Sequence, residues 1–139
     1  IQCQNNLKQL GLATHGIDLA MGVLPPLGVH DKFNPGSLHH TSRLVVPGPY
    51  QGAIGATVFF WLLPHLEQEP LFQGAGRDVS TVVGGRPVYG TPVKPYLCPA
   101  DPAGGDGMSP THNDGAGPWA AGNYAANYLV FGDPPAGRL

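Results

Sequence analysis

Apolar residues recur with helical spacing over the first 21 positions of the chain. They form one stripe whose members are separated by 4, 3, 7 and 4 positions: Cys3, Leu7, Leu10, Ile17 and Met21. Thr14 fills the gap in this stripe, and the polar residues between its members lie off it. The pattern predicts an amphipathic helix from Ile1 to about Ala20 that ends at Gly22. No capping residue precedes Ile1, so we expect the helix to continue upstream and the chain to be cut from something longer.

A second helical pattern covers residues 57–72. Four apolar side chains in this stretch share one helical face: Val58, Trp61, Leu62 and Leu66. Thr57 stands where it can cap the helix, and Pro64 predicts a break in it. Residues 27–55 show little periodicity and are predicted to form a long loop.

The remaining regular patterns indicate strands. Residues 79–89 predict a hairpin that turns at Gly84 and Gly85, with Pro87 confining its strand to a sheet edge. Residues 95–99 predict a short strand, and residues 123–131 predict another. The predicted fold class is α+β, with a long N-terminal α-helix packed on a small antiparallel β-sheet. We expect one domain over residues 1–139, in which residues 1–21 form the helix and residues 22–139 a loop-rich head.

Composition excludes several classes of protein. Hydrophobic residues make up 42% of the chain, enough for a core, whereas charged residues make up only 12%. The net charge of −2 and the 7 Lys and Arg residues offer no basic patch, so we expect no nucleic-acid partner. The longest apolar run, residues 58–63, is too short to span a bilayer, which takes roughly 18 residues. We therefore expect any membrane anchor to lie upstream of Ile1.

The two cysteines, Cys3 and Cys98, lie 95 positions apart. Metal sites usually contain closely spaced cysteine pairs, and this chain has none. We predict a disulfide that ties the first helix to a distant loop, which would imply an oxidising compartment. Two separate buried thiols are the alternative.

Four segments resemble a known family. They are CQNNLKQLGLA (residues 3–13), WLLPHLEQEPLF (61–72), YLCPADP (96–102) and GNYAANYLVFG (122–132). In this order they resemble the planctomycete family of prepilin-type proteins with an N-terminal cleavage and methylation motif. The resemblance implies a type IV pilin- or pseudopilin-like head that follows an apolar half-helix anchored in the inner membrane. The family's peptidase site and half-helix would precede Ile1 and a late glycine-rich element would follow Leu139, so we expect truncation at both ends.

The resemblance implies a structural function rather than an enzymatic one. Such proteins polymerise, helix against helix, into a type II secretion or type IV pilus-like filament at the cell surface or in the periplasm. The expected partners are other pilin-like subunits or further copies of the same chain. Leu12 and Leu19, which lie off the main stripe, are the residues that we expect to form the assembly face.

Three other sets of residues suggest binding or chemistry. Major pseudopilins bind calcium in a loop, and Asp101, Asp106 and Asp114, beside Asn113, offer such oxygen ligands here; ordinary turn formation is the alternative. Trp119, Tyr124 and Tyr128 suggest an aromatic platform for a glycan or a partner, with core packing as the alternative. The loop histidines suggest a metal site: His30, His39, His40, His65 and His112.

The sequence therefore carries three functional hypotheses. The first is the pilin-like structural subunit. The second is a surface binding module that recognises a glycan, a peptide or a metal ion. The third is a small metal-dependent hydrolase, but no nucleophile elbow or HExxH motif supports it, and we expect no enzyme and no cofactor other than calcium.

Overall fold

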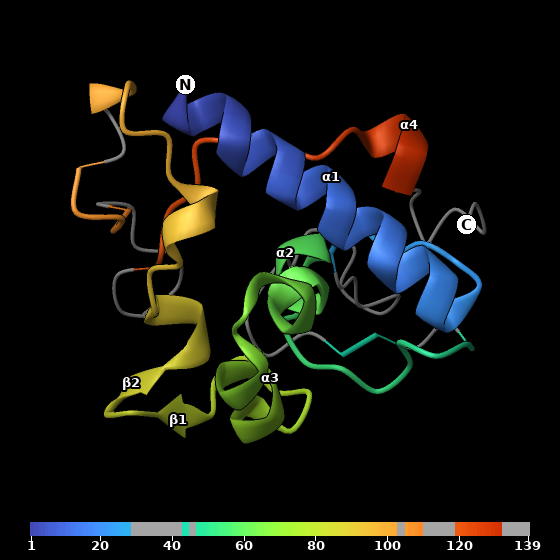
Figure 1. Cartoon of the computed structure of the whole chain (residues 1–139). Helices are drawn as coiled ribbons and strands as arrows, with labels where there is room; N and C mark the ends of the chain where they lie inside the picture. Colours follow the sequence, from blue (N-terminus) through green and yellow to red (C-terminus); the bar gives the residue numbers. More distant parts are fainter. Residues whose placement is uncertain (29–42, 45–46, 103–104, 110–118, 132–139) are drawn as a thin grey trace.

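A computed structural model describes residues 1–28, 43–44, 47–102, 105–109 and 119–131 of the chain. Its elements, in order, are α1 (Gln2–Met21), α2 (Val58–Leu62), η1 (Leu63–Leu66), α3 (Glu69–Ala75), β1 (Val82–Val83), β2 (Arg86–Pro87), η2 (Val88–Gly90), η3 (Lys94–Tyr96) and α4 (Tyr128–Phe131). Figure 1 shows α1 lying across one side of the molecule, with α2 and α3 beneath it and the β1–β2 hairpin at the far end. A long N-terminal helix and a two-stranded antiparallel sheet confirm the predicted α+β class.

The helix α1 forms as predicted and ends in a left-handed cap. Gly22 has φ 72°, and its N–H donates to the Asp18 carbonyl over 2.7 Å. Glycine adopts this conformation without the steric cost that a Cβ atom brings. Among the described residues, no helix is long and apolar enough to cross a bilayer.

The buried face of α1 differs from the predicted stripe. The helix buries Asn6, Leu10, Ala13 and Ile17. Leu7 and Met21, which the stripe included, are 53% and 44% exposed, so that part of the prediction is wrong. The helix is rotated because the Asn6 amide finds a hydrogen-bond acceptor inside the protein, while the small Ala13 allows close packing.

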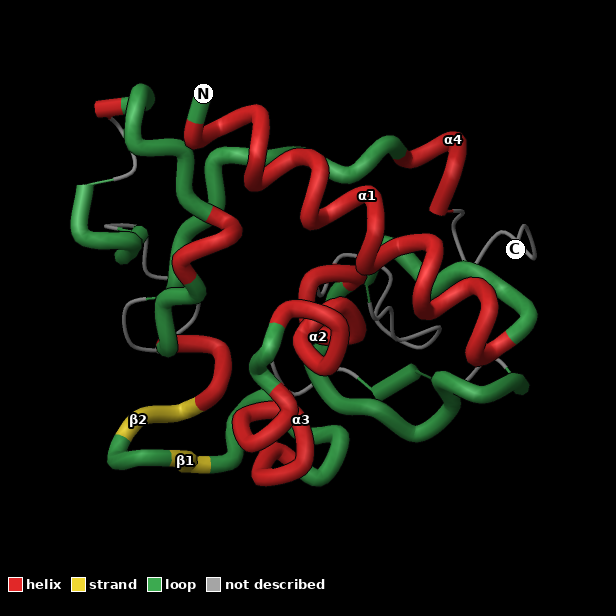
Figure 2. Tube along the Cα trace, viewed as in Figure 1, coloured by secondary structure: helices red, strands yellow, loops and turns green. Residues whose placement is uncertain are grey.

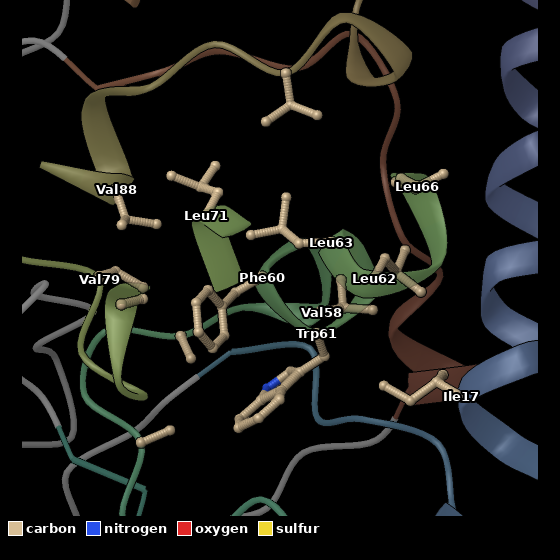
Figure 3. Packing of buried hydrophobic residues seen from close by; sticks show 14 of the residues in the cluster. Ile17, Val58, Phe60, Trp61, Leu62, Leu63, Leu66, Leu71, Val79 and Val88 are labelled. Atoms are coloured by element: carbon tan, nitrogen blue, oxygen red, sulfur yellow. The ribbon is translucent and has the colours of Figure 1, made fainter. Parts of the chain in front are cut away.

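The segment from α2 to α3 forms the centre of the core. The predicted break at Pro64 appears as a change from α-helix to the 3₁₀ turn η1, which ends at Glu67 in a left-handed conformation with φ 60°. Thr57 takes the capping position but makes no side-chain cap hydrogen bond. Figure 3 shows Phe60, Trp61 and Leu63 projecting from this segment into the cluster of buried apolar side chains.

The segments around this core make distinct contacts. Helix α1 packs chiefly against α2, η1 and η3, whereas β1 packs against α3. The hairpin has the predicted Gly84–Gly85 turn, with both glycines at positive φ, and pairs Val82 with Pro87. Figure 2 shows how little of the chain is strand and how much of the head is loop.

Two predicted strands are not present. Residues 95–99 instead contain the end of η3 followed by loop, and residues 123–131 end in the helix α4. A strand needs a neighbour along its length, because its backbone groups must be paired. The second segment has one such backbone bond near its start, from the Asn123 N–H to the Tyr96 carbonyl at 2.9 Å.

Candidate functional site

A disulfide joins the first turn of α1 to the loop that follows η3. Cys3 and Cys98 are bonded, and their Cα atoms lie 4.9 Å apart. Asn6, one turn further along α1, donates a hydrogen bond of 2.7 Å from its side-chain amide to the Leu97 carbonyl. Covalent and hydrogen-bonded links therefore connect the same two segments side by side, and they hold the N-terminal half of α1 against the head.

Asn123 extends this connection to a third segment. Its Oδ1 accepts the Cys98 N–H at 2.8 Å, while its Nδ2 donates to Asp101 Oδ2 at 2.8 Å. The Tyr124 hydroxyl donates to the Cys3 carbonyl at 3.1 Å. The hydrogen-bonding roles of Asn6 and Asn123 were not predicted, although both residues lie in segments that carry the family resemblance.

The opposite face of α1 presents apolar side chains to solvent. Leu12 is 62% exposed and Leu19 is 87% exposed. Leu12 lies two positions after the buried Leu10, and Leu19 two positions after the buried Ile17, which places each about 200° around the helix axis. The two leucines are one heptad apart, so they lie on the same ridge, and we call them the exposed ridge.

A groove of about 1170 Å³, lined by both polar and apolar side chains, lies along the N-terminal half of α1. Gln9 and Leu12 line it from the helix, and Lys94 and Asp101 line it from the segment around the disulfide. One member of the exposed ridge therefore borders a hollow.

The structure brings two of the three predicted aromatic residues together. Trp119 and Tyr124 both line an apolar cavity of about 310 Å³. Tyr89, which the sequence did not single out, lies against Trp119 with ring centroids 4.9 Å apart. Tyr128 is the first residue of α4, and its side chain lies outside the described part of the structure. The side chains of Trp119 and Tyr124 thus border one cavity next to the core.

The predicted calcium ligands are only partly described. Asp101 accepts a hydrogen bond from Asn123, and Asp106 Oδ1 accepts the Met108 N–H at 3.1 Å, as in a polar turn. Asp114 lies outside the described residues. Within the described ranges, no group of three or more His, Cys, Asp or Glu side chains is placed to hold a metal ion. Calcium binding stays a prediction.

The histidines are likewise incompletely described. His65 is exposed at the end of η1 and faces the backbone of α1 at Gly16. The other histidines predicted as ligands lie outside the described residues: His30, His39, His40 and His112. The metal-dependent hydrolase stays an untested alternative.

Two buried tyrosines act as hydrogen-bond donors within the core. The Tyr50 hydroxyl donates to the Val23 carbonyl at 2.7 Å, and the Tyr96 hydroxyl donates to the Phe59 carbonyl. Burial, and secondarily the Asp18 carboxylate, raises the pKa of Tyr50 to about 12. Burial also raises the pKa of Tyr96. Both groups are neutral donors at neutral pH, where they stabilise the loops around the core.

Comparison with known proteins identifies a family whose function is unknown. A family model described as "Protein of unknown function (DUF1559)" matches residues 1–137, which is nearly the whole chain. No curated protein and no solved structure matches the chain. The pilin-like assignment therefore stays a prediction that the residues themselves must support.

Proposed function

The chain belongs to the DUF1559 family of unknown function, and we propose that it is the head of a pilin-like structural subunit. In this proposal α1 packs its core-facing side on the head and its exposed ridge on the same helix of neighbouring copies. The subunits then form, or decorate, a secretion or pilus-like filament. The single observation that carries the proposal is the exposure of Leu12 and Leu19 on one ridge of a helix whose other side is buried.

The spacing of the ridge suits contact between helices. Apolar residues that recur every seven positions return to the same side of a helix, which is the arrangement that lets two helices pack along their length. Burying a leucine side chain contributes about 1.5–3 kcal/mol relative to leaving it in water. Two ridge leucines give a weak contact in a single pair, and a filament repeats that contact along many subunits.

The disulfide supports the same proposal. It holds the start of α1 in a defined direction relative to the head. A subunit that assembles through a helix needs a fixed orientation between helix and head, because a head that moves relative to the helix would collide with neighbouring subunits. Disulfides persist in oxidising compartments, which supports a head outside the cytoplasm, at the cell surface or in the periplasm. Anchoring to the inner membrane before assembly is part of the proposal through the pilin-like resemblance alone.

The binding module is the second candidate function. Trp119 and Tyr124 border the same cavity, and this observation favours ligand recognition over a purely structural head. The two functions are compatible, because the cavity and the exposed ridge share no residue among those described.

The test substitutes the ridge in the full-length protein. The variant Leu12→Glu with Leu19→Glu places two carboxylates on the ridge. The matched control, Gln4→Glu with Ala20→Glu, adds two carboxylates at exposed positions of α1 off the ridge. We expect the ridge variant to lose at least tenfold of the high-molecular-weight material released by shearing cells, and the control to keep it. Both should show wild-type thermal unfolding of the purified protein.

Two results would overturn the proposal. The first is a ridge variant that assembles as well as the wild type. The second is a wild-type protein that yields no assembled material at the cell surface while it is exported and folded.

A further inference from the structure

The apolar cavity near Trp119 adjoins the centre of the core. Its inner side is made by Phe60, Leu63, Leu71 and Val88, all of them buried and all labelled in Figure 3. A volume of about 310 Å³ reaches the lower end of the range for small-molecule sites.

The outer wall of the cavity is held in place by the backbone. The segment from Trp119 onward passes over the core side chains, and its Ala120 N–H donates to the Tyr89 carbonyl at 2.8 Å. Further along, the Asn123 N–H donates to the Tyr96 carbonyl at 2.9 Å. These bonds fix the wall at two points on the head. The cavity is therefore bounded by ordered backbone that would have to break hydrogen bonds to collapse onto the core.

The chemistry of the lining is apolar and uncharged. Among the described residues that line the cavity, none carries a charged side chain. Two of its tyrosines direct their hydroxyls to backbone carbonyls: Tyr96 to Phe59 and Tyr124 to Cys3. They therefore offer ring surface rather than hydroxyl groups to the cavity, and Trp119 and Tyr89 add two further rings.

We propose that this cavity binds a small neutral molecule with a flat apolar ring system, of about two fused rings in size. Apolar and aromatic walls favour such a ligand because its transfer from water is favourable and its ring faces can stack on theirs. An ionic ligand would lose its hydration without finding a partner among the described lining residues. This site rests on the binding-module candidate, whose ligand class it specifies, and it does not depend on the assembly function.

The probe for the test is N-phenyl-1-naphthylamine, a neutral molecule whose fluorescence rises in apolar surroundings. It is titrated into the native protein with the Cys3–Cys98 disulfide intact. We expect saturable one-to-one binding together with a higher Tm, because a ligand that binds only the folded state stabilises it. Binding that does not saturate, or that lowers the Tm, would report a partly unfolded chain and would overturn the proposal.

Substitutions localise the probe. We expect Trp119→Ala to weaken binding at least tenfold. Trp61→Phe is the control, since Trp61 is a core tryptophan that does not line the cavity. Because Trp119→Ala can itself disturb folding, amide chemical shifts of the wild-type protein provide a second measurement.

The chemical shifts also separate this proposal from the assembly function. Probe-induced changes should concentrate at Tyr89 and residues 120–122. Changes confined to the helix around Leu12 and Leu19 would place the probe on the exposed ridge, which overturns the cavity site and leaves the assembly proposal intact. An absence of binding, with the cavity amides unchanged at the highest soluble probe concentration, would also overturn it.

Discussion

Removing the disulfide by the double substitution Cys3→Ser and Cys98→Ser is expected to cost a large part of the stability. The cross-link joins residues 95 positions apart. In the chain-entropy description, closing a loop of that length removes freedom from the unfolded chain worth about 4–5 kcal/mol. Domains of this size unfold with a total of about 5–15 kcal/mol, so the variant should be only marginally stable.

The assay is equilibrium unfolding in urea at neutral pH. We expect the urea midpoint to fall, and the Tm to drop by roughly 15 °C for a domain of this length. Wild-type protein with a reduced disulfide is the matched control, because it lacks the cross-link but keeps both sulfur atoms. Both cysteines are only partly buried, so serine at these positions should add little desolvation cost of its own.

Hydrogen exchange then distinguishes where the disulfide acts. The bonds from Asn6 to Leu97 and from Tyr124 to Cys3 do not need the cross-link. If the disulfide stabilises the protein only by restricting the unfolded chain, the native contacts around Asn6 persist in the variant. Amides near Asn6 should then exchange only through global unfolding. A stability loss below about 1 kcal/mol, with an unchanged urea slope, would refute the entropic reasoning for a loop of this length.

Two further perturbations test the packing of α1 and the buried tyrosines. A Cβ atom at Gly16 would lie 2.8 Å from His65 Nδ1. We therefore expect Gly16→Ala to stabilise the protein by about 1 kcal/mol in a His65→Ala background but not in the wild type. Equal changes in the free energy of unfolding in both backgrounds, measured in urea, would contradict the contact. The pKa of Tyr50 is about 12 in the folded protein, against the usual 10.0, so folding favours the neutral hydroxyl. The stability that this preference adds is fully present below pH 10 and is lost as the pH rises toward 12. Between pH 9 and 12, the urea midpoint of Tyr50→Phe should fall less steeply with pH than that of the wild type. The decline that remains in the variant is assigned to Tyr96, whose pKa is also raised. An identical decline in both proteins would count against the raised pKa of Tyr50.

Features that depend on neighbours in the sequence could be predicted. The helix over the first 21 residues follows from its apolar spacing and from Gly22, and the break at Pro64 from the missing N–H of proline. The hairpin follows from the Gly84–Gly85 pair, whose positive φ angles match the turn that joins two strands. Each of these rests on interactions within a few residues, so the local sequence is sufficient.

The candidate sites could be predicted only in part. Leu12 and Leu19 are placed opposite the buried side of the helix by helical geometry, and their exposure agrees with it. The wall of the apolar cavity could not be predicted, because it depends on Tyr89 and Trp119, which are 30 positions apart in the sequence. Periodicity carries no information about which distant loops meet.

The sequence by itself determined the helix over the first 21 residues, the break at Pro64, the turn at Gly84–Gly85 and which two cysteines were available to pair. The tertiary structure alone decided which side of α1 is buried, because the position of Asn6 depends on a carbonyl 91 residues away. It also decided that residues 123–131 are not a strand. Strand formation requires a partner along the whole segment, whereas a helix satisfies its backbone hydrogen bonds within itself.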